Sequence, residues 1–144
     1  MHIDGSCHCG DIAYEAEIDP AKVALCHCTD CQVMSGSAFR SLAFTREGSF
    51  RLRSGTPALY VKTGDSGNKR EQGFCPRCGT PIYSAPPGDG PKVHVLRAGT
   101  IRQRDALVPK VEFWCRSARS WVAPHSEAMR FDTQPSFSPK GAAD

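Results

Sequence analysis

The sequence predicts an all-β fold of a single domain, and three observations support this prediction. Segments of five to nine residues rich in β-forming or alternating side chains recur along the 144-residue chain. Its 13 glycines and 11 prolines indicate many turns between short elements. A chain of this length is large enough for one substantial core but not for two.

The clearest strand covers residues 11–18, where apolar and acidic side chains alternate as in a half-buried strand. Residues 29–35 are expected to form one short helix. Turn residues separate the remaining elements, most clearly around Gly48, Gly55 and residues 86–91. Further strands are expected at residues 37–45, 49–54, 57–62, 92–98 and 110–115.

The chain is expected to divide into a zinc-binding body at residues 1–123 and a C-terminal tail at residues 124–144. The tail is polar and rich in proline and serine, which is typical of a loop. Phe131 and Phe137 are its candidate anchors, on the body or on a neighbouring chain. A homodimer is therefore compatible with the sequence.

Composition and charge narrow the functional classes. The start of the chain has no basic stretch followed by an apolar core, and no apolar run reaches membrane-spanning length, so we expect a cytoplasmic protein without membrane contact. The formal charge is +3. Seven thiolates with two divalent cations would bring it to about zero, so bulk charge predicts no nucleic-acid partner.

Seven of the eight cysteines fall into three clusters, which we interpret as metal ligands because disulfides are rare in cytosolic proteins. The clusters are Cys7 with Cys9, then Cys26, Cys28 and Cys31, then Cys75 with Cys78. Structural zinc takes four ligands, whereas catalytic zinc takes three and keeps one open position. Seven cysteines therefore suggest one site of each kind.

The first and third clusters together supply four thiols. Cys75-x-x-Cys78 followed by glycine is a zinc-knuckle spacing, and Cys7 and Cys9 share one face if their segment is extended. Four buried reduced thiols are the alternative, because free cysteine is common in cores. An isolated redox motif at residues 75–78 is a weaker one, because no βαβ pattern surrounds it.

The middle cluster supplies only three thiols within six residues. A zinc held there would keep a position for water, a substrate thiol or His27. A second structural site is the alternative, completed by a distant Cys115, His94 or His125. An empty or oxidised cluster and an iron–sulfur cluster are further alternatives.

Several other residues have ordinary structural interpretations. His8 and His27 each lie between two cysteines, where an extended segment turns the middle side chain away from the metal. Cys115 is expected to be a packed thiol and His94 a structural histidine. The face containing Arg51 and Arg53 is expected to be solvated.

The sequence resembles the glutathione-dependent formaldehyde-activating enzyme family, which includes centromere protein V. The motifs GSCHCG, CHCTDCQVMSGSAF, GFCPRCGTPIYS, AGT and WCRSARSW carry the resemblance across about residues 3–122. Residues 111–116, VEFWCR, depart from the family's pattern. The resemblance implies an Mss4-like fold, in which short antiparallel sheets surround zinc.

The resemblance also implies a structural zinc on Cys7, Cys9, Cys75 and Cys78, and a second, exchangeable zinc on the catalytic Cys26, Cys28 and Cys31. It implies a carbon–sulfur lyase that joins glutathione to formaldehyde as an S-hydroxymethyl adduct, so the expected partners are a small thiol and an aldehyde. A non-catalytic zinc module or a thiol-adduct carrier is the alternative. Candidates to bind a substrate carboxylate are Arg40, Arg70 and Arg77.

Overall fold

A computed structural model describes residues 1–64 and 67–135. The described residues form a mostly β structure with one α-helix, α1 (Thr29–Ser35), which confirms the expected all-β class. The ten strands are β1 (His2–Ser6), β2 (Ala13–Cys26), β3 (Arg40–Thr45), β4 (Arg51–Ser54), β5 (Ala58–Thr63), β6 (Lys69–Phe74), β7 (Pro81–Ala85), β8 (Val95–Arg97), β9 (Val111–Phe113) and β10 (Met129–Arg130).

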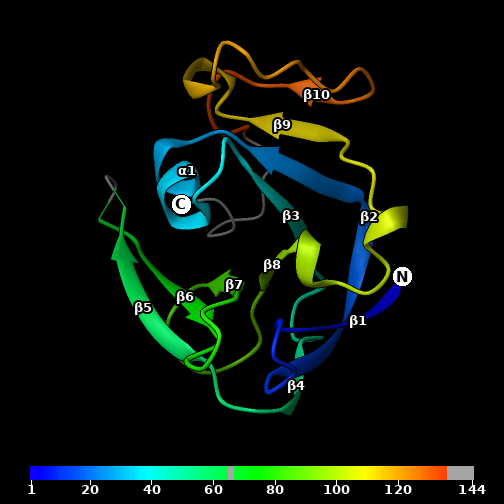
Figure 1. The fold of residues 1–144 in the computed structure, drawn as a ribbon, viewed down its shortest axis with the longest axis vertical. Helices are drawn as coiled ribbons and strands as arrows, with labels where there is room; N and C mark the ends of the chain where they lie inside the picture. The colour runs from blue at the N-terminus through cyan, green and yellow to red at the C-terminus, as the bar shows by residue number, and fades with distance from the viewer. Residues whose placement is uncertain (65–66, 136–144) are drawn as a thin grey trace.

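Strand β2 organises the sheet because it pairs with four other strands. Its first half pairs with β1 and β4, and its second half pairs with β9, while β3 contacts both halves across a register shift between Ile18 and Val23. In Figure 1, β2 runs from β1 and β4 on the lower right to β9 at the top. Beyond β3 the sheet continues through β8, β7 and β6 to the edge strand β5.

The interior contains two groups of buried apolar side chains. The larger includes Ile3, Tyr14 and Ile82 and extends to Cys7 and Cys75. The smaller contains Leu42, Phe44 and Phe113 together with Cys26 and Cys31. Each cysteine cluster therefore borders its own part of the core.

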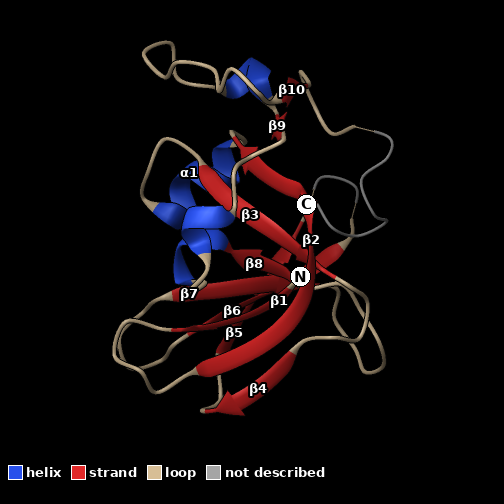
Figure 2. Cartoon of the chain, turned by 90° about the vertical axis from the view of Figure 1, so that its right-hand side faces the viewer, coloured by secondary structure: helices blue, strands red, loops and turns tan. Residues whose placement is uncertain are grey.

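The helix α1 begins and ends at identifiable caps. The Cys28 sulfur accepts a hydrogen bond from the Cys31 backbone N–H at its start, and Gly36 adopts a left-handed conformation (φ 65°) at its end. The helix lies beside β3 (Figure 2). Its bounds agree with the helix predicted at residues 29–35.

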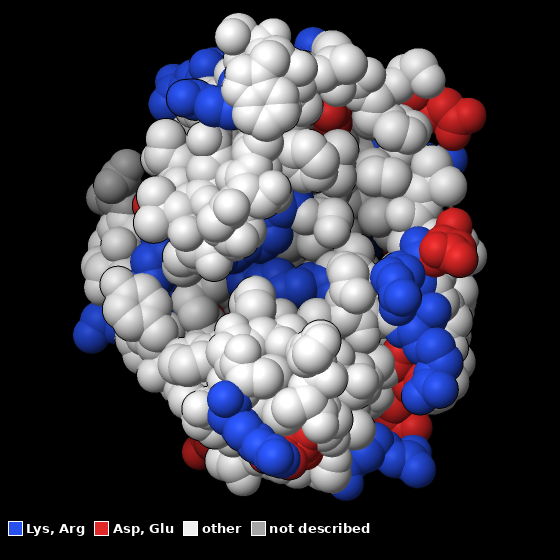
Figure 3. All heavy atoms as spheres, viewed as in Figure 1, with Lys and Arg blue, Asp and Glu red and all other residues white. Residues whose placement is uncertain are grey.

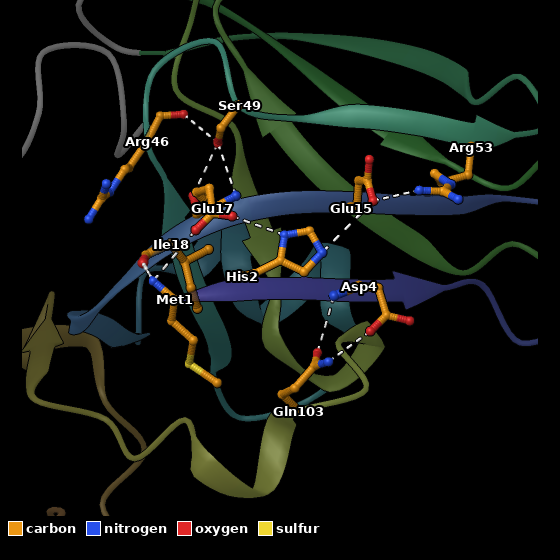
Figure 4. Close-up of polar contacts among 10 residues, drawn as sticks. All are labelled: Met1, His2, Asp4, Glu15, Glu17, Ile18, Arg46, Ser49, Arg53 and Gln103. Carbon is orange, nitrogen blue, oxygen red and sulfur yellow. Dashed lines mark hydrogen bonds and ion pairs between the residues drawn. The ribbon is translucent and has the colours of Figure 1, made fainter.

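The N-terminal strand β1 is fixed to β2 by polar contacts as well as by strand pairing (Figure 4). The Met1 ammonium donates to the Ile18 carbonyl at 2.9 Å, and His2 Nδ1 lies 2.9 Å from Glu17 Oε1. The Asp4 N–H donates to Gln103 Oε1 at 3.1 Å. These contacts place Cys7, which follows β1, at a defined point beside the larger core.

The beginning of the predicted tail lies against the body. Strand β10 pairs in parallel with β9, and Phe131 packs on the smaller core. Phe137 falls outside the described residues, and an association with a neighbouring chain stays a prediction. Within residues 1–64 and 67–135, no helix is long and apolar enough to cross a membrane.

Candidate metal centre

The structure brings Cys7, Cys9, Cys75 and Cys78 together, with all four sulfurs within 4.8 Å of one another. The Sγ atoms of Cys7 and Cys9 are 3.6 Å apart, and those of Cys9 and Cys75 are 3.8 Å apart. Sulfurs bound tetrahedrally to zinc at about 2.3 Å would be separated by about 3.8 Å. The four thiols therefore fit a tetrahedral zinc ion in number and in spacing.

Backbone N–H groups at the ends of the strands support this four-cysteine cluster. Ile12 N–H donates to the Cys7 sulfur at 3.2 Å, and Cys78 N–H donates to the Cys75 sulfur at 3.5 Å. A hydrogen bond with the Thr80 hydroxyl lowers the pKa of Cys78 to about 5. Such contacts stabilise the thiolate form, which is the form that binds metal.

Cys26, Cys28 and Cys31 form a second group, with their sulfurs also within 4.8 Å of one another. Cys26 ends β2, Cys28 caps α1, and Cys31 lies in the first turn of that helix. Hydrogen bonds from Cys26 and Cys31 lower the pKa of Cys28 to about 2, and the same contact with Cys28 raises the pKa of Cys26. The group thus stabilises one thiolate even without a metal, and a cation would displace the remaining protons.

No fourth ligand joins this three-cysteine group in the part of the chain that the structure describes. Cys115 lies instead with His27 and Glu112. His94 stacks on Phe50, with ring centroids 4.3 Å apart. The arrangement favours an open coordination position over a second closed structural site.

A buried polar network lies behind the three-cysteine group. His27 and Glu112 are each only 1% exposed, and His27 Nε2 lies 3.3 Å from Glu112 Oε1. Arg130 donates to the other Glu112 oxygen at 3.0 Å. Gln32 donates to the backbone carbonyls of His27 at 2.8 Å and of Ser117 at 3.0 Å. This network holds the segment between Cys26 and Cys28 in place.

The remaining histidine and cysteine predictions can be compared with this arrangement. His8 is exposed, and His27 is grouped with Glu112 and Cys115 rather than with the three-cysteine group, as expected for side chains directed away from a metal held there. Cys115 is half-buried, and its sulfur donates to the Glu112 carbonyl at 3.6 Å. It is therefore packed at the edge of the core rather than inside it.

Two neighbouring cavities lie next to the three-cysteine group. The smaller, of about 30 Å³, is lined by the three cysteines and by basic side chains that include Arg40, Lys62 and Arg97. The larger, of about 200 Å³, is lined by Tyr60, Gln72 and Tyr83 among others. Met34, Arg40 and Arg97 border both cavities. Figure 3 shows basic side chains within a hollow in the middle of this face.

The structure separates the three arginines that the sequence suggested. Arg40 lines both cavities, whereas Arg70 is buried behind them and donates to Ser84 at 3.4 Å. Arg77 lies outside both cavities, exposed on the surface, where it pairs with Asp11 at 3.1 Å. Arg51 and Arg53 are exposed, as expected.

Sequence reasoning missed Arg97, a second arginine of the cavity wall. It ends β8 and is only 6% exposed. Burial, with a smaller contribution from nearby Arg40, lowers the pKa of its guanidinium to about 9. The signal was an arginine directly after the apolar residues 95–96, where a buried charge is unusual.

The profile of the glutathione-dependent formaldehyde-activating enzyme (GFA) family matches residues 2–117. The chain belongs to the GFA family. This membership confirms the resemblance drawn from the cysteine motifs and agrees with clusters able to hold metal ions.

A curated relative is an uncharacterized lyase of Schizosaccharomyces pombe, which is 30% identical over 82 residues. The match covers 57% of this chain and 56% of the relative, so the chain spans just over half of that protein's length. A crystal structure of a Rhodobacter sphaeroides protein is similar to the fold, with a TM-score of 0.54 and 21% identity. That match covers 69% of this chain and 87% of the other, and it supports the fold alone.

Proposed function

We propose that this GFA-family chain is a zinc-dependent carbon–sulfur lyase. It would join glutathione, or a similar small thiol, to formaldehyde or a related aldehyde, and would cleave the adduct in reverse. The observation that carries the proposal is the three-cysteine group, which lines a basic cavity without a fourth ligand in the described residues. Family membership and the lyase name of the yeast relative support the same class of reaction.

Cys26, Cys28 and Cys31 would hold the second zinc, and Cys7, Cys9, Cys75 and Cys78 would hold the first. A zinc bound at the second site would supply stabilisation of an incoming thiol as its thiolate at neutral pH. None of the four cysteines of the first cluster lines either of the two cavities described above, so we assign to that cluster the role of stabilising the fold.

The reaction forms one C–S bond and transfers one proton. The substrate sulfur attacks the carbonyl carbon, the C–S bond forms, and the carbonyl π electrons move to oxygen. A proton released from the thiol returns to that oxygen, which gives the S-hydroxymethyl product. Arg40 lines the cavity, so its positive charge would stabilise both the thiolate and the developing oxygen charge.

Exchange NMR of glutathione with formaldehyde tests this proposal. The zinc-loaded wild type is expected to accelerate formation of the adduct over the spontaneous rate. Cys28→Ser should remove the acceleration, while serine still caps α1. Cys115→Ser is the matched control outside the group, and it should retain full activity.

Binding of glutathione, measured by calorimetry on the same samples, separates the alternatives. Binding without acceleration would support a carrier of thiol adducts. Absence of both binding and acceleration would leave only a structural zinc module. Either result overturns the lyase proposal for this thiol and aldehyde.

A further inference from the structure

Arg40 is a buried cation that lacks a hydrogen-bonding counterion in the described part of the protein. It begins β3 and is 7% exposed. Its Nε atom is buried without a hydrogen-bond partner, and the side chain borders both cavities. An unpaired buried charge is costly, so a site of this kind normally binds an anion.

Arg97 stands on the same wall and has only neutral partners among the described residues. Its Nη2 donates to Gln72 Oε1 at 2.7 Å, and its Nη1 donates to the Val95 carbonyl at 3.2 Å. Its Nε is also buried without a partner. The hydrogen bonds orient the guanidinium and leave its charge unmatched.

The charges around the smaller cavity leave a positive excess. Lys62 pairs with Asp30 at 2.8 Å, so these two charges cancel. Three thiolates with one divalent cation carry a net charge of −1. Arg40 and Arg97 together carry +2, so the site has one positive charge in excess before a substrate binds. An anionic ligand would balance this excess, and the unpartnered Nε of Arg40 makes its guanidinium a place for a negative group of that ligand.

The sizes of the cavities restrict this anion. A space of about 30 Å³ has room for one or two water molecules or for a group of carboxylate size. The planar guanidinium fork matches the two oxygens of a carboxylate. The adjoining space of about 200 Å³ is left for the rest of the molecule.

We propose that Arg40 and Arg97 form a carboxylate subsite, and that the thiol substrate of this chain is therefore an anion. The subsite selects thiols whose carboxylate lies a few bonds from the sulfur, because the three cysteines and both arginines line one small cavity. The inference rests on the proposed function only in assuming that the substrate sulfur is placed at the three cysteines.

A matched pair of probes tests the subsite: 3-mercaptopropionate and its neutral counterpart 3-mercapto-1-propanol. Calorimetry on the zinc-loaded wild type is expected to show about tenfold or greater preference for the carboxylate, as for a hydrogen bond between charged groups. Arg40→Gln and Arg97→Gln should each remove most of this preference, because the affinity for the carboxylate falls much more than the affinity for the neutral thiol. Arg77→Gln, on the exposed arginine beside Asp11, should retain it.

The outcomes distinguish this inference from the proposed function. Equal affinity of the wild type for both thiols overturns the subsite and leaves the lyase proposal standing. If neither thiol binds, the assumption that these thiols place their sulfur at the three cysteines fails, the glutathione experiment still decides the lyase proposal, and propionate then decides the subsite. The subsite is supported if the wild type binds propionate and both Arg→Gln variants lose this binding. It is overturned if the variants still bind propionate, or if the wild type does not bind it. Circular dichroism of each variant verifies the fold. If Arg40→Gln unfolds, Arg40→Lys replaces it, and because lysine keeps the positive charge this variant should retain part of the preference for the carboxylate.

Discussion

The four-cysteine and three-cysteine clusters differ in how much of the chain they connect. The first joins residues 66 positions apart, such as Cys9 and Cys75, whereas the second lies within one turn-and-helix segment of six residues. Closing a long loop removes more conformational freedom from the unfolded chain than closing a short one. The first cluster can therefore stabilise the fold in a way that the second cannot.

The two clusters also differ in the side chains that surround them. The four-cysteine cluster borders an apolar core, with Ile3 and Ile82 fully buried. The three-cysteine cluster borders buried polar and charged side chains, including Arg40, Arg97 and Glu112. Apolar packing therefore surrounds one cluster, whereas buried charged side chains surround the other.

The largest expected effect comes from removing one ligand of each cluster. Cys75→Ser should abolish the cooperative thermal transition, because structural zinc contributes about 10 kcal/mol or more to small folds. Cys28→Ser should lower stability by only about 1 kcal/mol, because the serine keeps the helix cap. Circular dichroism melting of both variants is the measurement, and equal losses would contradict the division of roles.

The second effect concerns the buried polar network of His27, Glu112 and Arg130, which lies next to the three-cysteine cluster. Glu112→Ala should cost about 3 kcal/mol, because it leaves buried His27 and the Arg130 guanidinium without their carboxylate. Glu127→Ala removes an exposed carboxylate paired with Lys110 and should cost less than about 0.5 kcal/mol. Urea unfolding gives both values.

Metal analysis of the Glu112→Ala protein tests whether the two clusters bind metal independently. The variant is expected to lose metal from the three-cysteine cluster and to retain it at the four-cysteine cluster. Loss of metal from both clusters at once would show that the two regions are not independent.

The third effect is a pH dependence of the free energy of unfolding, and it comes from His94, which stacks on Phe50 beside the larger core. Burial lowers the pKa of His94 to about 4, below its unfolded value near 6.5. The unfolded chain therefore binds a proton first, and stability falls as the pH drops from about 6.5 toward 4. The wild type should lose about 1 kcal/mol more than His94→Phe between pH 7.5 and 5, after allowance for partial solvent access. Urea midpoints at the two pH values give this difference, and equal losses would remove His94 as the cause.

The smallest effect is expected at the N-terminal strand. His2 is 60% exposed and lies beside Glu15 and Glu17 (Figure 4). His2→Ala should change stability by less than about 0.5 kcal/mol, because exposed ion pairs contribute little. A larger loss in thermal melting would show that surface contacts, and not the cysteines, fix β1.

Local signals predicted much of this structure. Helix α1 was predicted at its observed bounds, because Cys28 directly precedes the helix and Cys31 lies in its first turn. Strands β3, β4, β5, β8 and β9 all overlap predicted segments. The structure also brings the seven thiols together in the two groups that their spacing suggested, and the metal-binding and catalytic roles of these groups stay predictions.

Other elements carry signals that conflict with ordinary strand patterns. Strand β6 was missed because its sequence, KREQGF, places the buried Arg70 and Gln72 where apolar residues would be expected. Strand β2 continues past the predicted end at residue 18 because a bulge accommodates Pro20 between two paired halves. Strands β1 and β7 were also missed: each pairs with a strand next to it along the chain, β1 with β2 and β7 with β6, and side-chain propensity does not report such pairing.

The bulge in β2 makes this strand tolerant of changes in chain length at one place. A deletion of one residue within a regular strand turns every later side chain to the opposite face, which here would direct Cys26 away from its partners. Residues 20–22 are exposed and lie between Ile18 and Val23, where the pairing is already interrupted. A short insertion there would leave both halves in register. This segment is therefore the natural position for a peptide tag or a spectroscopic label between the two centres.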